Sequence, residues 1–226
     1  MDVKSAYQTL IMSSSKTKRN NSTTKHLINF AGTTIETTVT SNAAAVDKWV
    51  EDILTQHGSH PTVVGLDVEW RPHVFSSMSN KSATLQLCIA NKCLILQLFY
   101  LVNDEIPLSL KSFLLNTNFT FVGIEVDDDV KKLTCEYGLE CGATADIKVL
   151  AMKRWPGKYS RPGLKDLAFD VSGLKMTKEK HVCMSNWEAR VLNDGQVEYA
   201  CVDAYASYRV GLELISENLE MVQSFD

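Results

Sequence analysis

The stretch VVGLDVEWRP, residues 63–72, constrains the fold more than any other part of the chain. Its Val and Leu residues indicate a buried β-strand, which Asp67 and Glu69 interrupt. Residues two apart in a strand share a face, so both carboxylates point the same way, beside Gly65, which leaves room next to them. Two unpaired buried charges cost on the order of several kcal/mol. Arg or Lys partners would relieve this cost, and a divalent cation such as Mg²⁺ or Mn²⁺ would relieve it more completely.

Length and composition favour one domain preceded by a tail. The chain has 226 residues, and residues 1–25 are rich in Ser, Thr, Asn and Lys without periodicity. This predicts a flexible tail over 1–25 and a single domain over 26–226. No apolar run approaches the ~18 residues that span a bilayer, and the start lacks the apolar segment of a secretory signal. We therefore expect no membrane partner and a location in the nucleus or cytoplasm.

Cysteine spacing supports a reducing environment. The six cysteines form no C-x-x-C pair and are not spaced with histidines as in zinc sites. We expect reduced thiols, with Cys88 and Cys201 acting as small apolar residues.

Local patterns predict strands followed by alternating strands and helices. Alternation around Ala31-Gly32 indicates a hairpin over 26–41, and helical spacing indicates a helix from Ser41 or Asn42 to Gly58. Further strands are expected at about 62–69, 84–90, 93–99 and 119–126, with Asn91-Lys92 as a tight turn. Further helices are expected at 108–116, 128–139, 163–173 and 194–221. This order predicts an α/β fold with a mixed sheet of five to six strands flanked by helices.

Charge is distributed unevenly along the chain. The total is −4, which excludes an overtly basic nucleic-acid binder, yet residues 146–180 hold nine Lys and Arg against four acids. That segment carries +5, so the rest carries −9. It is either a solvated face or a phosphate-binding surface. In the second case Arg154 and Arg161 would track phosphates while Trp155 stacks on an unpaired base, for ~1–3 kcal/mol per base. For Trp155 the favoured alternative is packing in the core.

Two further acidic features lie later in the chain. Asp127, Asp128 and Asp129 follow a predicted strand, and acids at a helix start stabilise it by ~0.3–1 kcal/mol. Two of the three are expected to do only that, while one can point back over the sheet. Tyr199 and Asp203 are four apart in the last helix, so they share a face, and small alanines around them allow close packing on a sheet. Alternatively, Tyr199 is a core aromatic and Asp203 a surface acid.

Taken together, these acids resemble the DEDD exonucleases, and Tyr199 matches the DEDDy branch, which includes ribonuclease D and Werner-type exonucleases. The DEDDh branch has His five residues before the last Asp, where this chain has Glu198. Similarity extends over about residues 60–215, through ATLQLCIANKCLILQL, FVGIEVDDDVKKLTCEYGL, GLKDLAFDVSG and SNWEARVLNDGQVEYACVDAYASYRV. Gap-free alignment selects Asp129 as the metal-binding Asp, with Asp127 and Asp128 as rivals. The chain departs from the family at Glu125, where Gly is usual.

The resemblance implies a ribonuclease H-like fold and hydrolysis of nucleic-acid 3′ ends to nucleoside 5′-monophosphates. It further implies that two Mg²⁺ or Mn²⁺ ions are held by four carboxylates, those of Asp67, Glu69, Asp129 and Asp203. Tyr199 would orient the attacking water, because a phenol with a pKa near ~10 is a poor base. Trp70 occupies a position where Werner-type enzymes have the same residue, and it would contact the terminal base or pack in the core.

The Werner-type resemblance favours DNA over RNA, with single-stranded or recessed 3′ ends and a place in DNA repair. Animal Werner proteins carry a helicase, so a helicase is an expected partner in trans; the oligomeric state is left open. Two alternatives compete with the enzyme. One is a nucleic-acid-binding or scaffolding module on the same fold with weak turnover, and the other is an α/β interaction protein whose acids only cap and solvate.

Overall fold

Seven strands form one mixed sheet in the computed structural model, which describes residues 22–73, 78–101 and 106–223. The order is β1-β2-β5-β4-β3-β6-β7, with β2/β5, β3/β6 and β6/β7 parallel and the other pairs antiparallel. The strands are β1 (Thr23–Phe30), β2 (Thr33–Thr40), β3 (Thr62–Trp70), β4 (Ser82–Ile89), β5 (Lys92–Leu96), β6 (Phe119–Gly123) and β7 (Thr144–Asp146). The mixed sheet is confirmed, but the expected five to six strands were too few, because β7 is too short to show a pattern.

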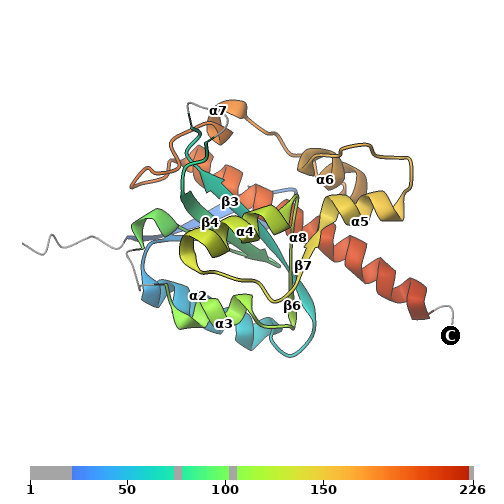
Figure 1. Cartoon of the computed structure of the whole chain (residues 1–226), viewed down its shortest axis with the longest axis horizontal. Coiled ribbons are helices and arrows are strands. Elements are labelled where there is room, and N and C mark those ends of the chain that lie inside the picture. The colour runs from blue at the N-terminus through green and yellow to red at the C-terminus, as the bar shows by residue number, and fades with distance from the viewer. Residues whose placement is uncertain (1–21, 74–77, 102–105, 224–226) are drawn as a thin grey trace, which may run out of the picture.

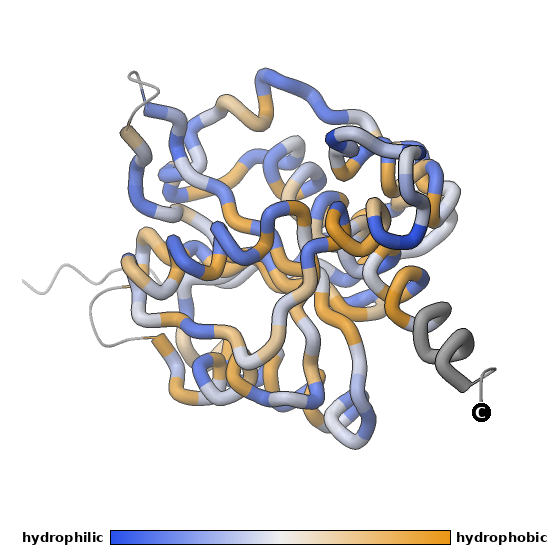
Figure 2. Tube along the Cα trace, turned by 45° about the vertical axis from the view of Figure 1, so that its right-hand side comes forward, coloured by the Kyte–Doolittle hydropathy of each residue, from blue (hydrophilic) through white to orange (hydrophobic). Residues whose placement is uncertain are grey.

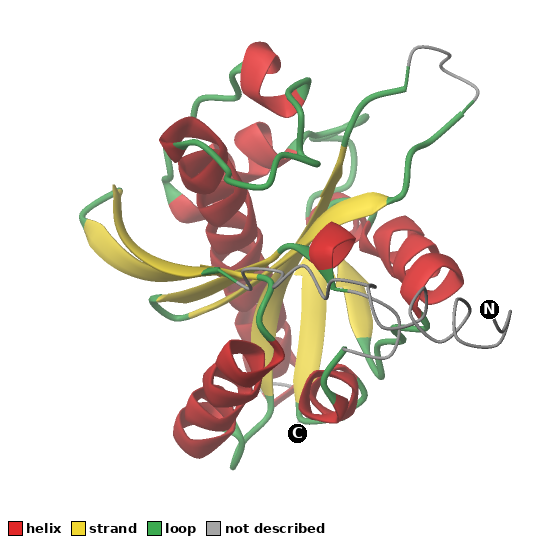
Figure 3. Cartoon of the chain, turned by 90° about the vertical axis from the view of Figure 1, so that its left-hand side faces the viewer, coloured by secondary structure: helices red, strands yellow, loops and turns green. Residues whose placement is uncertain are grey.

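Helices cover both faces of this sheet (Figures 1 and 3). One hydrophobic cluster joins helices α2, α3 and α4 to one face, and a second joins α5, α6 and α8 to the other. The helices are α2 (Ala43–His57), α3 (Leu108–Leu114), α4 (Val126–Tyr137), α5 (Ile147–Arg154), α6 (Leu164–Ser172), α7 (Lys180–Cys183) and α8 (Asp194–Gln223), with a 3₁₀ turn at Leu98–Tyr100. Hydrophobic residues run along the central strands, and hydrophilic ones dominate the connections (Figure 2). None of the helices within the described ranges is long and apolar enough to cross a membrane.

Strand β3 separates its two faces by strict alternation. Val64, Leu66 and Val68 belong to the cluster with α2 and α4, whereas Val63 belongs to the cluster with α8. Asp67 and Glu69 have the same parity as Val63, so they lie on the α8 face. The sequence therefore assigned both carboxylates to one side correctly.

Gly65 decides how close helix α8 comes to this face. A Cβ at Gly65 would lie 1.9 Å from the carbonyl oxygen of Ala204, so the helix backbone rests directly on the strand. Ala200, Ala204 and Ala206 are fully buried, as expected from their small size. The room that Gly65 leaves is thus filled by α8, which brings the helix beside Asp67 and Glu69.

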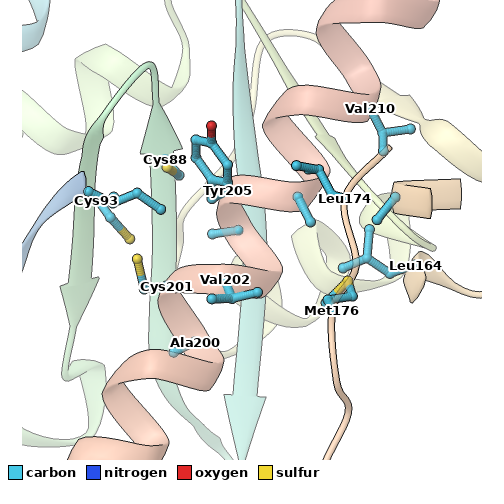
Figure 4. Close-up of a cluster of buried hydrophobic side chains, with 14 of the residues drawn as sticks. Cys88, Cys93, Leu164, Leu174, Met176, Ala200, Cys201, Val202, Tyr205 and Val210 are labelled. Atoms are coloured by element: carbon cyan, nitrogen blue, oxygen red, sulfur yellow. The ribbon is translucent and has the colours of Figure 1, made fainter. Parts of the chain in front are cut away.

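Three of the six cysteines lie in the hydrophobic cluster between the sheet and α8. Cys88 and Cys93 lie opposite each other on β4 and β5, and Cys201 of α8 lies beside them (Figure 4). All three are fully buried, and all six cysteines are free. The Thr37 hydroxyl donates to the Cys201 sulfur at 3.1 Å. The apolar role predicted for Cys88 and Cys201 is confirmed.

Several predicted boundaries were wrong by a few residues. Strand β6 ends at Gly123 rather than at residue 126, because Glu125 adopts a left-handed conformation with φ +55° that starts α4. This conformation favours glycine, which the resembling family has here. The turn after β4 uses Ala90-Asn91 rather than Asn91-Lys92, with Ala90 at φ +51°. Strand β5 stops at Leu96, before the 3₁₀ turn, instead of reaching residue 99.

The termini of the predicted domain are only partly described. Residues 1–21 of the expected tail lie outside the described residues, and β1 begins at Thr23, just before the expected boundary. The long last helix begins at Asp194. Its cap is reciprocal, because the Asn193 side chain accepts from the Gln196 amide at 2.9 Å while the Gln196 side chain accepts from the Asn193 amide at 3.1 Å.

Candidate active site

The five residues that the sequence nominated for catalysis line one cavity of about 590 Å³, which we call the acid cavity. Asp67 and Glu69 come from the end of β3, and Tyr199 and Asp203 come from α8. Asp129 lies in the first turn of α4, directly after β6. Because β3 and β6 are parallel neighbours, their ends meet at one edge of the sheet. The fold therefore brings together all five residues that the sequence nominated for catalysis.

The carboxylates of the acid cavity repel one another in a poorly solvated space. Burial, followed by the charge of Asp203, raises the pKa of Asp67 well above its usual value. Burial and the charges of Asp67 and Asp203 do the same to the pKa of Glu69. Burial, Asp67 and Asp128 raise the pKa of Asp129 to about 8. The site is therefore short of positive charge at neutral pH.

Lys178 supplies part of that charge. Its Nζ lies 2.7 Å from Asp203 Oδ2, and the Asp203 side chain is only 4% exposed. Burial opposes the ammonium, yet the carboxylates of Asp203, Asp67 and Glu69 raise the pKa of Lys178. Sequence reasoning counted Lys178 only as one charge of the basic segment. Its partner lies 25 residues away along the chain, so no local spacing could have revealed the pair.

The segment Ser185-Asn186-Trp187 packs against Tyr199, a role that the sequence did not reveal. The Trp187 ring of Ser185-Asn186-Trp187 lies 6.0 Å from the Tyr199 ring and is 1% exposed. Its indole N–H donates to the Cys183 carbonyl at 3.1 Å, and Gln196 donates to the Ser185 hydroxyl at 2.9 Å. Burial and the nearby carboxylates of Asp203 and Glu69 raise the pKa of Tyr199, so its hydroxyl stays protonated at neutral pH.

The three consecutive acids after β6 have different surroundings. Asp127 is exposed and its carboxylate accepts from the Thr144 hydroxyl at 2.6 Å. Asp128 lies at the rim of the acid cavity and forms an exposed ion pair with Lys131 at 2.8 Å. Asp129 is the most enclosed of the three, and the charge of Asp67 acts on it. Of the three, Asp129 is therefore the one whose carboxylate interacts with Asp67 in the acid cavity.

Of the predicted substrate contacts, only Trp70 lines the acid cavity. The Lys132 ammonium lies 5.2 Å from the centre of its ring. Arg154 ends α5, and Trp155 packs against the core with its ring 6.1 Å from that of Tyr159. Neither Arg154 nor Trp155 lines the acid cavity, and Arg161 lines a different hollow.

That hollow, which we call the basic groove, has a volume of about 650 Å³ and follows α6 and the segment before it. Four cationic residues line it against two acids, namely Lys158, Arg161, Lys165 and Lys175 against Asp166 and Asp170. Asp170 is already bound by Lys158 at 3.2 Å and by the Tyr159 hydroxyl at 3.0 Å. Within the described residues Arg161, Lys165 and Lys175 form no ion pair. A smaller cavity of about 260 Å³ is lined by Lys175 as well as by Tyr199 and Asp203.

The donor set of the acid cavity fits a hard divalent cation. The ligand candidates are carboxylates, and Asp67 Oδ2 is buried without a hydrogen-bond partner in the described structure. Among the described residues, no group of three or more His, Cys, Asp or Glu side chains is already drawn together as a metal site.

Comparison with known proteins gives consistent results. A family model described as 3′-5′ exonuclease matches residues 40–217. A 3′-5′ exonuclease of Arabidopsis thaliana is 33% identical over 149 residues, which cover 65% of this chain and 50% of the relative. The bifunctional 3′-5′ exonuclease/ATP-dependent helicase WRN of Mus musculus is 28% identical over 170 residues, which cover 74% of this chain and 12% of the relative. The chain thus spans half or less of the length of these relatives.

The fold is also found in solved structures. Trypanosoma brucei RNase D in complex with RNA U12 superimposes with a TM-score of 0.65 at 18% identity, covering 79% of this chain and 62% of that one. At this identity the likeness concerns the fold, and it confirms the ribonuclease H-like α/β architecture expected from the sequence.

Proposed function

The chain belongs to the 3′-5′ exonuclease family, and from this premise we propose that it hydrolyses the 3′-terminal phosphodiester bond of a nucleic acid. The products would be a nucleoside 5′-monophosphate and a strand shortened by one residue. One observation carries the proposal: carboxylates from β3, α4 and α8 line the same cavity as Tyr199. The test measures shortening of a labelled strand from its 3′ end in Mg²⁺ or Mn²⁺, with and without chelator. Shortening that stops when chelator is added supports the proposal. Binding without turnover would instead support the scaffolding module.

Asp67, Glu69, Asp129 and Asp203 would hold two divalent cations. Bound there, the ions would supply activation of a water and stabilisation of the leaving 3′ oxygen. The orphaned oxygen of Asp67 and the raised pKa values of its neighbours support this, because both indicate a missing positive charge.

Tyr199 would orient the attacking water by donating a hydrogen bond from its hydroxyl. Burial and the nearby carboxylates raise the pKa of Tyr199 in the metal-free protein, which favours orientation of the water over removal of its proton. Trp187 holds the ring in place from the core side. Trp70 and Met184, which is 55% exposed, line the same cavity and offer apolar contact to the terminal base.

Tyr199→Phe is expected to lower the single-turnover rate on the order of 10²-fold, because orientation is lost while the ring remains. Substrate affinity, measured by fluorescence anisotropy with Ca²⁺ in place of Mg²⁺, should change little. Tyr205→Phe is the matched control, because Tyr205 lies on the same helix but its hydroxyl meets Thr33 at 3.3 Å, outside the acid cavity. Equal rates for both variants would contradict the role given to Tyr199.

The basic groove would take the phosphates of the strand on the 5′ side of the cleaved nucleotide. Arg161, Lys165 and Lys175 can bind phosphates without first breaking an ion pair of the described structure. Phe169 lines the same groove and is 53% exposed, which suits stacking on an unpaired base. Trp155 contributes indirectly, by packing against Tyr159 at the groove wall, and Arg154 precedes it at the end of α5.

Changing both Arg161 and Lys165 to Ala is expected to weaken single-strand binding about tenfold or more at low salt. The slope of log K against log salt should become shallower by roughly 0.7 for each phosphate that the variant no longer neutralises. The control double variant changes Lys48 and Lys111 to Ala, which removes the same charge from α2 and α3, away from the groove. If both double variants bind equally weakly, the groove has no specific role.

We propose DNA as the favoured substrate, with single-stranded or recessed 3′ ends. The resemblance of the sequence to Werner-type exonucleases supports this choice, and with it we propose a role in DNA repair in the nucleus or cytoplasm. The mouse relative, which is named a bifunctional exonuclease and helicase, supports a helicase partner in trans. The RNase D structure with RNA makes RNA the competing substrate. Rates on DNA and RNA strands of the same sequence decide between them, and faster cleavage of RNA would reject the DNA preference alone.

A further inference from the structure

We propose that Lys178 is an exchangeable counter-ion of the acid cavity, which holds Asp203 in the metal-free protein and must leave before divalent cations bind. The inference rests on the proposed metal centre. Its starting observation is the contact of 2.7 Å between Lys178 Nζ and Asp203 Oδ2. The Asp203 side chain is 4% exposed, whereas that of Lys178 is 38% exposed, so the lysine enters from the solvent side.

Lys178 is placed to act on most of the acid cavity. Its charge acts on Asp67 and Glu69 as well as on Asp203. The other nearby ammonium, that of Lys132, acts on Asp129 and is already held by Glu136 and by the Asn80 carbonyl at 2.7 Å. One ammonium thus acts on three carboxylates, of which Asp203 is buried and Asp67 and Glu69 are half-buried, and it leaves most of their negative charge uncompensated.

The lysine and a metal compete for Asp203. A cation ligated by Asp203 would compete for Oδ2, the oxygen that Lys178 now binds. It would also bring a double positive charge close to the ammonium in a poorly solvated cavity, where like charges repel strongly. Binding of the metal and departure of Lys178 are therefore one coupled event.

The segment that carries Lys178 allows this departure without unfolding. Residues 174–179 form neither helix nor strand, and within the described structure no backbone amide of residues 175–178 donates a backbone hydrogen bond. Leu174 and Met176 anchor the segment, with 5% and 3% exposure, beside Leu164 in the core (Figure 4). Lys178 lies beyond this anchor, so its side chain can turn to solvent while Met176 stays in place.

The two sides of this segment face different spaces. Lys178 lines the acid cavity, whereas Thr177 and Glu179 line the smaller cavity on its other side. Both cavities reach Tyr199 and Asp203, so the segment is the wall between them. Release of Lys178 from Asp203 would loosen this wall next to the proposed catalytic groups.

The test compares the Mn²⁺ affinity of the wild-type protein with that of Lys178→Met, without nucleic acid. Electron paramagnetic resonance measures the free Mn²⁺ at each point of the titration. Removing the competing charge should tighten Mn²⁺ binding by about tenfold or more. The control Lys180→Met removes the same charge two residues away, from an exposed lysine that lines none of the three cavities, and should shift affinity by less than about twofold. Lys178→Gln, which can still donate to Asp203, should also tighten binding and serves if the Met variant does not fold.

The outcomes separate this inference from the proposed function. No Mn²⁺ binding to the wild-type protein would overturn the metal centre itself. If the wild type binds Mn²⁺ and the folded variants Lys178→Met and Lys178→Gln bind it with equal or lower affinity, the exchange alone is overturned. A permanent structural ion pair predicts the latter result, because the metal would then bind without disturbing Lys178.

Discussion

Asp67→Asn is expected to reduce the exonuclease rate by on the order of 10³-fold while raising the melting temperature of the metal-free protein at pH 8. The rate falls because an amide is a poor ligand for a hard cation, and a metal contributes several kcal/mol at roughly 1.4 kcal/mol per factor of ten. Stability rises because Asp67 is buried among like charges and its Oδ2 has no partner in the described structure. An uncharged side chain of the same shape removes that repulsion.

Single-turnover cleavage and thermal unfolding by circular dichroism measure the two effects on one sample. Asp127→Asn is the matched control, because Asp127 is an exposed acid bound to Thr144 and lies outside the acid cavity. It should keep its activity and gain no stability. Full activity in folded Asp67→Asn would remove Asp67 from the metal centre, and a lower melting temperature would show that its charge is compensated in the free protein.

The second large effect is an unusual pH dependence of the metal-free protein. The pKa of Asp129 is raised to about 8 in the folded state, whereas it is about 4 in the unfolded chain. Between these two pH values Asp129 is protonated when the protein is folded and ionised when it is unfolded. The pKa values of Asp67, Glu69 and Asp203 are raised as well. Unfolding then releases protons from these groups, so their contribution to the free energy of unfolding is greatest below about pH 4 and falls as pH rises toward 8. We expect the melting temperature in chelator to drop by on the order of 5 °C between pH 5 and pH 8.

Divalent cations should reverse this trend. Their ligands must be deprotonated, so stabilisation by Mg²⁺ or Mn²⁺ should be small at pH 5 and large at pH 8. Saturation at about a hundredfold over Kd adds roughly 2.7 kcal/mol. The measurement is a series of melting curves over this pH range, with metal and with chelator. A metal-free melting temperature that rises from pH 5 to pH 8, or a metal effect independent of pH, would contradict the acid cavity as described.

The sequence alone predicted those features that depend on neighbours along the chain. Alternation in residues 62–70 places Asp67 and Glu69 on one face because the strand period is two. The four-residue spacing of Tyr199 and Asp203 places them together because they share a helix face. The helix caps expected at Ser41 or Asn42 and at Asn193 or Asp194 are likewise local, and the structure has them at Asn42 and Asn193; the turn expected at Ala31-Gly32 is also present.

Only the tertiary structure decided which distant groups meet. The close contact of α8 with Gly65, the ammonium of Lys178 on Asp203 and the support of Tyr199 by Trp187 depend on how helices dock on the sheet. In the tertiary structure Arg154 and Trp155 do not line the acid cavity, and Arg161 lines the basic groove, although all three lie in one basic segment. Spacing along the chain reports which face a side chain occupies, but charge compensation depends on distances across the core, which no local pattern encodes.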